Sequence, residues 1–273
     1  MLVVMSFWTQ RFWMSPLKRF RSVLLSLALV LAGAPAEAET ITIAAASDLK
    51  FAMDEIVANF RKIRPQDEIA VTYGSSGRFH TQIQQGAPFD LFFSADISLP
   101  RELVKSGHAA SDVRPYAFGR IVLWSATLDA SQMTLQSLTG PGITRIAIAN
   151  PKHAPYGQRA EEALRAAGVW NKVEPKLVLG ENIAQTAQFV QSGNAQVGVI
   201  ALSLALNSEL ASKGGYWLIP DSLHEPLEQG YVITRRAAGN ALAHEFAEYA
   251  ASPSSRAIMT RYGFVLPDSV GGK

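Results

Sequence analysis

The chain has 273 residues, of which 48% are hydrophobic and 18% are charged. This length and composition suit one large or two ordinary globular domains with a substantial core. The sequence contains no cysteine, which excludes disulfides, thiolate nucleophiles and cysteine-based metal sites.

The first 38 residues have the pattern of a secretory signal peptide. Lys18, Arg19 and Arg21 form a basic region, and residues 23–32 (VLLSLALVLA) form a short apolar run. Small residues follow, with an A-x-A cleavage site that ends at Ala38. We expect export to the periplasm with cleavage, because the apolar run is too short to cross a membrane. An uncleaved membrane anchor is the alternative, and a lipoprotein is not expected because no cysteine follows the signal.

Cleavage of this signal changes the net charge. Residues 1–38 hold four basic residues and one acidic residue, so the formal charge of +2 for the whole chain becomes −1 for the mature protein. The high pI of about 8.8 therefore belongs to the export signal. No basic stripe or RNA-binding motif follows it, so we expect no nucleic-acid partner.

From residue 39 onward, predicted strands run directly into predicted helices. Thr40–Ala46 is expected to be a strand, and from Leu49 to Phe60 apolar residues recur at the spacing of one helix face. A second strand, 69–73, leads through the turn G-S-S-G into a helix over 79–85 that Gly86 ends. The next predicted elements are the strands 89–94, 145–149, 177–179 and 196–201 and the helices 158–167 and Ile183–Gln191.

Two further strands indicate that the chain leaves one lobe and returns to it. Residues 117–125 (AFGRIVLWS) are expected to enter a second lobe, and residues 230–234 (GYVIT) to return from it. Two C-terminal helices, 241–251 and 254–262, are expected to be separated by Pro253. We therefore predict two lobes with a cleft between them.

Alternating strands and helices predict α/β layers with mainly parallel sheets. In such sheets, ligands bind beyond the carboxyl ends of the strands, where helices begin. The first turn of a helix presents free backbone N–H groups and the positive end of the helix dipole. Several such turns meeting at one point would bind an anion without formal positive charge. The turns of this chain carry serine and glycine and hardly any lysine or arginine.

Motifs for catalysis, metal binding and nucleotide binding are missing. The five histidines lie far apart, with no H-E-x-x-H spacing, and neither a P-loop nor G-x-G-x-x-G is present. G-S-S-G is not the G-x-S-x-G nucleophile elbow. We therefore expect no enzyme, no cofactor and no direct protein–metal ligand, and we keep a secreted hydrolase that uses Ser76 as an alternative.

Several polar or donor residues stand at turns that precede or open a helix. Ser47 and Asp48 follow the first strand, and either side chain could cap the helix. Ser76, Tyr156 and Ile183 stand at three other turns. Taken singly, these residues have ordinary explanations as a cap, a turn residue, a surface aromatic and a core residue. Taken together, each could offer an O–H or N–H donor to one crevice.

Five stretches together resemble a known family. They are A-A-A-S-D-L, Y-G-S-S-G with G-A-P-F-D-L-F-F-S-A-D, N-P-K-H-A-P-Y-G, G-E-N-I-A-Q-T-A-Q-F-V and the terminal R-Y-G-F. In this order they resemble the molybdate-binding proteins of ABC importers, which are two-lobed (type II) periplasmic solute-binding proteins. The resemblance implies two α/β lobes, each a mainly parallel sheet flanked by helices, with the ligand cleft between them. Lobe I is expected to comprise residues 39–118 and 232–273, and lobe II residues 119–231.

The resemblance also implies the residues that hold a tetrahedral oxyanion. Ser47 and Ser76 would donate their hydroxyls and nearby N–H groups, and Ile183 would donate its backbone N–H. Tyr156 would contribute from lobe II through the turn amide and its phenol. Some members carry a tyrosine on the strand that here reads V-G-V-I-A-L-S. This chain has Ala201 there, which indicates the branch in which Tyr156 takes that role.

The role of Asp48 bears on which oxyanion is bound. We expect its carboxylate to cap the helix, which leaves Ser47 free to face the ligand. Molybdate and sulfate are fully ionised near neutral pH, so a site made only of donors suits them. Hydrogen phosphate carries a proton and needs an acceptor, so phosphate is favoured as the ligand if Asp48 points into the cleft.

The resemblance predicts a monomeric protein that captures molybdate or tungstate for a membrane permease of an ABC importer. The first alternative is a binding protein for another oxyanion, such as sulfate or phosphate. The second is a ligand-sensing regulatory domain of similar fold, which would need a helix-turn-helix segment where this chain has an export signal.

Overall fold

The computed structural model describes residues 38–267. The predicted signal peptide therefore lies outside the described residues except for Ala38. A compact unit begins at Glu39. None of the helices among residues 38–267 has the length and hydropathy needed to cross a bilayer.

The first sheet, that of lobe I, has the strand order β2-β1-β3-β10-β4. Its strands are β2 (Glu68–Gly74), β1 (Thr40–Ala46), β3 (Leu91–Ser94), β10 (Leu227–Ile233) and β4 (Arg114–Gly119). β1 pairs in parallel with β2 and β3, whereas β10 is antiparallel to both β3 and β4. The sheet is therefore mixed, with β10 as the reversed strand.

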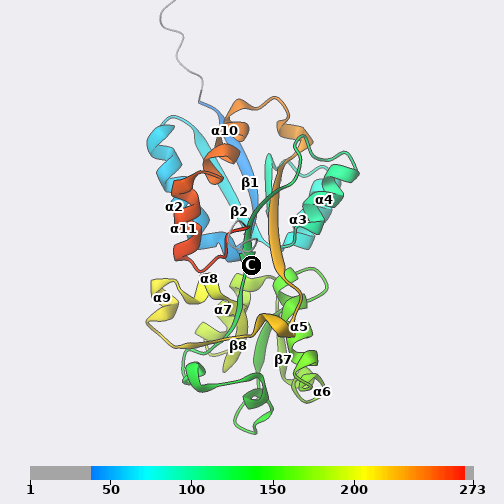
Figure 1. Cartoon of the computed structure of the whole chain (residues 1–273), viewed down its shortest axis with the longest axis vertical. Coiled ribbons are helices and arrows are strands. Elements are labelled where there is room, and N and C mark those ends of the chain that lie inside the picture. The colour runs from blue at the N-terminus through cyan, green and yellow to red at the C-terminus, as the bar shows by residue number, and fades with distance from the viewer. Residues whose placement is uncertain (1–37, 268–273) are drawn as a thin grey trace, which may run out of the picture. The chain divides into compact units, whose positions relative to one another are not determined.

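Helices cover both faces of this sheet. Lobe I contains α2 (Lys50–Ile63), α3 (Ser76–Gln84), α4 (Ser98–Lys105), α10 (Ala241–Ala250) and α11 (Pro253–Arg261). One core joins the apolar residues of β1, α2, α10 and α11, and a second joins α3 and α4 to the other face. Figure 1 shows these two groups of helices on opposite sides of β1.

The second sheet, that of lobe II, has the strand order β7-β6-β8-β5-β9. Its strands are β7 (Leu177–Gly180), β6 (Ile146–Ala149), β8 (Val197–Ala201), β5 (Ile121–Trp124) and β9 (Tyr216–Leu218). β6 pairs in parallel with β7 and β8, and β5 is antiparallel to β8 and β9. This sheet is therefore also mixed, with β5 as the reversed strand.

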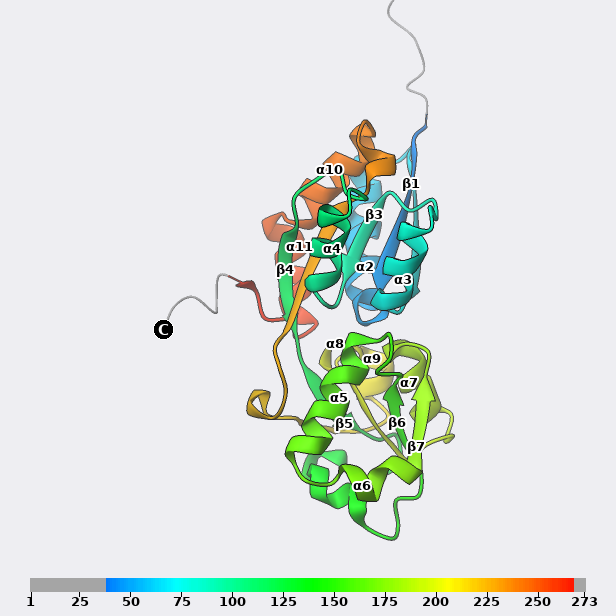
Figure 2. The same cartoon turned by 90° about the vertical axis from the view of Figure 1, so that its right-hand side faces the viewer.

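Lobe II has one continuous apolar core, in which Trp124 is fully buried. Its helices α5 and α7 both contact β6 and β8, and Figure 2 shows them on either side of β6. The helices of lobe II are α5 (Pro155–Ala166), α6 (Trp170–Val173), α7 (Ile183–Gln191), α8 (Leu202–Ala205) and α9 (Ser208–Ala211). The 3-10 turns of the described chain are η1 (Ser47–Leu49), η2 (Ala130–Gln132), η3 (Leu135–Thr139), η4 (Glu174–Lys176), η5 (Asp221–Leu223) and η6 (Arg235–Ala237).

The predicted two-lobed α/β fold is confirmed, but the crossings between the lobes differ in detail. The single strand predicted over 117–125 is two strands in different sheets, because β4 ends at Gly119 and β5 begins at Ile121. Where the chain returns to lobe I, β10 begins at Leu227, before the predicted start at residue 230. Residues 227–231, which we assigned to lobe II, therefore belong to the sheet of lobe I. The strand begins with the largely polar residues L-E-Q, so its sequence does not indicate that it lies buried between two neighbouring strands.

Three helices start earlier than predicted. α3 begins at Ser76 rather than 79, α5 at Pro155 rather than 158, and α11 at Pro253 rather than 254. Proline is favourable in the first turn of a helix, where its missing N–H would be unpaired anyway. Ser76 and Tyr156, predicted to lie in turns, therefore lie in first helical turns.

Candidate functional site

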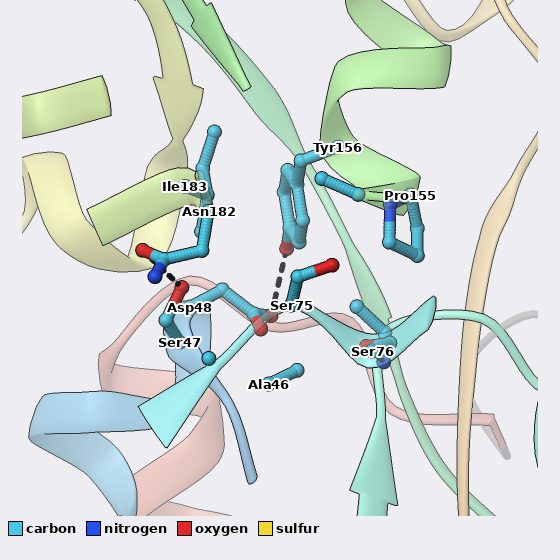
Figure 3. A pocket seen from close by; sticks show the side chains of 12 residues that line it. Ala46, Ser47, Asp48, Ser75, Ser76, Pro155, Tyr156, Asn182 and Ile183 are labelled. Carbon is cyan, nitrogen blue, oxygen red and sulfur yellow. Dashed lines mark hydrogen bonds between the residues drawn. The ribbon is translucent and has the colours of Figure 1, made fainter. Parts of the chain in front are cut away.

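The candidate site is a pocket at the junction of the two lobes. It lies where β1 meets η1 and β2 meets α3 in lobe I, and against the N-termini of α5 and α7 in lobe II (Figure 3). Its cavity volume is about 10 Å³, measured as the space open to the centre of a water-sized sphere. Pockets for drug-sized ligands usually hold about 300–1,000 Å³. The pocket is therefore far too small for a drug-sized ligand.

The structure brings all five predicted site residues together. Ser47, Asp48, Ser76, Tyr156 and Ile183 line this one pocket. Each is at most 3% exposed. Contact of each residue with a ligand stays a prediction, but their convergence from four separate turns of the chain is what a shared site requires.

Ser47 connects the two lobes directly. It is the first residue of η1, immediately after β1. Its hydroxyl donates to Asn182 Oδ1 at 3.2 Å and accepts from the backbone N–H of Ala184 at 3.2 Å. Asn182 caps α7 by accepting from the Gln185 N–H at 3.0 Å. The Ser47 hydroxyl therefore lies against the first turn of α7.

The start of α3 forms a second contact between the lobes. The Ser76 hydroxyl, from the first residue of α3, accepts from the Ala95 N–H at 3.0 Å. The Ser75 hydroxyl and the Gly77 N–H both donate to the carbonyl oxygen of His153, the latter at 3.0 Å. A Cβ at Gly77 would lie 2.6 Å from that oxygen, so this close approach requires glycine. The turn N-P-K-H-A-P-Y-G is thus held against the G-S-S-G turn.

Helix N-termini supply the positive potential of the pocket. The pocket is lined by the first residues of α3, α5 and α7. Within residues 38–267, no side-chain hydrogen bond caps the start of α3 or α5. The Gly77 N–H already donates to His153 and Pro155 has no N–H, so the backbone N–H groups of Ser76 and Tyr156 are the ones left for a ligand in these first turns. No lysine or arginine is among the described residues that line the pocket. The arrangement can bind an anion through dipoles and N–H donors alone.

Asp48 does not cap the helix, so this expectation was wrong. No side-chain cap is present at η1 or α2 in the described chain. The carboxylate oxygen Oδ2 instead accepts from the Tyr156 hydroxyl and from Gln229 Nε2, both at 2.9 Å. Gln229 Nε2 also lies 3.1 Å from the Tyr156 hydroxyl oxygen. The reason is burial: Asp48 is 1% exposed, and the Tyr156 hydroxyl from α5 reaches it there (Figure 3). Gln229 reaches the same oxygen from β10.

Burial also changes the protonation of this cluster. Loss of solvent raises the pKa of Asp48 to about 6, and the hydrogen bonds from Gln229 and Tyr156 partly oppose that rise. Burial, and then the charge of Asp48, raise the pKa of Tyr156 well above its ordinary value. The Tyr156 phenol therefore stays protonated and remains a donor.

Sequence reasoning missed Gln229 and Gly119. Gln229 is fully buried on β10, one residue before the strand that we predicted. Gly119 ends β4 at the crossing between the lobes, and a Cβ there would overlap the Tyr156 hydroxyl and lie 2.6 Å from Gln229 Nε2. Their proximity to the site comes from the pairing of β10 with β4, which no local pattern reveals.

An ion pair lies near the pocket. Arg78 of α3 pairs with Glu181, which precedes α7, and His153 Nε2 lies 3.9 Å from the other carboxylate oxygen of Glu181. The side chains of Arg78 and Glu181 are 56% and 37% exposed, so water weakens their attraction. Among residues 38–267, no group of three or more His, Asp or Glu side chains could hold a metal ion.

The chain matches known proteins over most of its length. The family described as bacterial extracellular solute-binding protein matches residues 41–265. The molybdate-binding protein ModA of Rhodobacter capsulatus is 37% identical over 246 residues, covering 88% of this chain and 94% of the relative. ModA of Azotobacter vinelandii is 34% identical over 232 residues, covering 85% of this chain and 92% of the relative.

A solved structure shows the same architecture. The periplasmic molybdate-binding protein of Azotobacter vinelandii superposes with a TM-score of 0.78 and 31% sequence identity, covering 83% of this chain and 99% of that one. The expected two-lobed fold and family are therefore confirmed. With a family match over nearly all of the described residues and a two-lobed fold that encloses a small donor-lined pocket, this chain belongs to the bacterial extracellular solute-binding proteins.

Proposed function

We propose that the protein binds molybdate, or tungstate, in the periplasm and delivers it to the membrane permease of an ABC importer. It holds the intact oxyanion without cofactor, without a direct protein–metal bond and without catalysis, and it acts as a monomer. The observation that carries the proposal is the convergence of serine hydroxyls and three helix N-termini on one small pocket whose described lining has no lysine or arginine.

The donor set suits a fully ionised tetrahedral anion. The hydroxyls of Ser47 and Ser76 come from lobe I, and the N-termini of α5 and α7 come from lobe II. Hydrogen bonds from donors to an ionised acceptor are about twice as strong as neutral ones. The relatives with 34–37% identity are named for molybdate binding, which favours this anion over others of the same shape.

Ligand capture would depend on contact between the lobes. The segments at Gly119–Ile121 and before Leu227 are where the chain crosses, which makes them the natural hinge. The contacts of Ser47 with α7 and of Ser75 with His153 join the lobes around the pocket. An anion that receives donors from both lobes would stabilise this arrangement, and the permease would recognise it.

One observation favours a different oxyanion. Asp48 lines the pocket and brings a potential acceptor into it. An ionised carboxylate can accept the proton of hydrogen phosphate, which a donor-only site cannot do. Phosphate is therefore the second candidate.

A thermal-shift panel of oxyanions tests the proposal. At a ligand concentration 100 times Kd, a bound anion stabilises the protein by about 2.7 kcal/mol, and for a chain of this size each kcal/mol raises Tm by about 2–4 °C. We expect molybdate and tungstate to raise Tm by about 5–10 °C and sulfate and phosphate to have little effect. Stabilisation by phosphate but not by molybdate would overturn the proposal.

A further inference from the structure

One oxygen in the pocket lacks the partner that a buried polar atom normally has. Asp48 is 1% exposed and lines the pocket. Its Oδ2 accepts from Tyr156 and Gln229, whereas Oδ1 has no hydrogen-bond partner among the described residues. Buried polar atoms without a partner are rare and costly. Because Oδ2 is engaged, Oδ1 is the oxygen left for a ligand.

The ionised form of Asp48 conflicts with a bound dianion. Like charges in a buried site raise each other's energy, so they do not both stay ionised when one of them can take a proton. Molybdate at neutral pH has no proton to share, and a carboxylate has no proton to donate. A protonated Asp48 removes the repulsion and supplies one more donor.

We infer, on the basis of the proposed function, that Asp48 takes up one proton from solvent when the oxyanion binds, and that Oδ1–H then donates to an oxygen of the ligand. The step moves one proton from water or buffer to the carboxylate and breaks no other bond. Tyr156 and Gln229 continue to donate to Oδ2, so the proton resides on Oδ1, the oxygen that is available to the ligand.

The surroundings of Asp48 favour the protonated form. The ionisable side chains that face it are the phenols of Tyr156 on α5 and Tyr116 on β4, and burial and the charge of Asp48 raise the pKa of both. The helices α7 and α8, which pack against η1, contain no ionisable residue. The strand β2 also contacts η1, and its Tyr73 hydroxyl donates to Asp54 Oδ1. On α2, Lys50 is turned to the surface, where it pairs with Asp54 at 3.0 Å.

No cation therefore compensates the charge of Asp48 within the described chain. Ser203 Oγ donates to the Asp48 backbone oxygen at 2.8 Å, which fixes the residue without stabilising its carboxylate. Burial already raises the pKa of the carboxyl to about 6, and the charge of a bound dianion acts in the same direction. Proton uptake at pH 7–8 follows from the two effects together.

Asp48 also discriminates between a dianion and an oxyanion that carries a proton. Hydrogen phosphate would bring its own proton and donate it to an ionised Oδ1, so its binding would leave the proton count unchanged. Molybdate binding would consume one proton. The number of protons taken up therefore distinguishes the two modes of binding.

Titration calorimetry in buffers of different ionisation enthalpy measures this number. With sodium molybdate and the mature protein in Tris and in HEPES at pH 7.5, we expect uptake of about one proton for each anion bound. We also expect Kd to rise about tenfold per pH unit between pH 7 and pH 8. Binding without proton uptake and with a constant Kd over this range would overturn the inference.

Two variants sharpen the test. Asp48→Asn keeps the shape and supplies an amide donor, so we expect molybdate binding without proton uptake and with a Kd that does not change with pH. Asp112→Asn alters an exposed aspartate outside the pocket and should behave as the wild type. Proton uptake that persists in Asp48→Asn would assign the proton to another group.

Failure of the proposed function would give a different result, because the wild type would then give no molybdate-dependent heat in any buffer.

Discussion

Replacing Tyr156 by phenylalanine tests the buried cluster at the junction of the lobes. The Tyr156 hydroxyl donates to Asp48 Oδ2 at 2.9 Å, and both residues are at most 2% exposed. The change removes one hydrogen bond to a charged acceptor and leaves the ring in place. Gln229 still donates to the same oxygen, so Asp48 is not left without a donor.

The expected loss depends on pH. A hydrogen bond to a charged group contributes about 1.5–3 kcal/mol, and one between neutral groups about 0.5–1.5 kcal/mol. Since the pKa of Asp48 is about 6, its carboxyl is ionised at pH 7.5 and mostly protonated at pH 5. We therefore expect Tyr156→Phe to lower the free energy of unfolding by about 1.5–3 kcal/mol at pH 7.5 and by about 0.5–1.5 kcal/mol at pH 5.

Urea unfolding of the mature protein at the two pH values measures this difference. Tyr216→Phe is a matched control, because Tyr216 lies on the edge strand β9 and is 37% exposed. We expect that control to change stability by less than about 0.5 kcal/mol. Equal destabilisation by Tyr156→Phe at both pH values would refute the assignment of an ionised Asp48 as its acceptor.

Three further predictions concern the same region. Gly119→Ala should destabilise the protein by more than about 1 kcal/mol, because the new methyl group overlaps the Tyr156 hydroxyl; unchanged urea unfolding would contradict the packing. Asp48 binds its proton more tightly in the folded than in the unfolded protein, so its contribution is present below about pH 4 and lost as pH rises through 6. The stability of the wild type relative to Asp48→Asn should thus fall by about 2.4 kcal/mol between pH 4 and pH 7, and a constant difference would contradict this. Arg78→Ala should cost less than about 1 kcal/mol, since its pair with Glu181 is exposed; a larger loss in urea unfolding would show that this pair is not solvated.

Local sequence patterns predicted much of the fold. The strand Thr40–Ala46 and the helix Ile183–Gln191 have the predicted bounds, because apolar periodicity and an asparagine cap act within a few residues. The starts of α3 and α5 were placed three residues too late. Their first turns carry small or proline residues without apolar periodicity, so the pattern shows the helix only from its second turn.

Contacts between distant segments were not predictable in the same way. The family resemblance led to Ser47, Ser76, Tyr156 and Ile183, which the structure places around one pocket. The partners of Asp48 were missed, because Tyr156 and Gln229 lie 108 and 181 residues away along the chain. Helix capping is a local rule, and here the tertiary environment determined what the side chain does.

The central claim is that uncharged donors, among them the serine hydroxyls of lobe I, hold a small dianion. The most direct test is a calorimetric titration of molybdate into the wild type and into the double variant Ser47→Ala/Ser76→Ala. Each lost hydrogen bond to the anion should cost about 1.5–3 kcal/mol, which corresponds to about 10- to 150-fold in Kd. The exposed Ser208→Ala is the matched control and should bind as the wild type. We predict one molybdate per chain and a Kd at least 100-fold higher in the double variant; an unchanged Kd would contradict the claim.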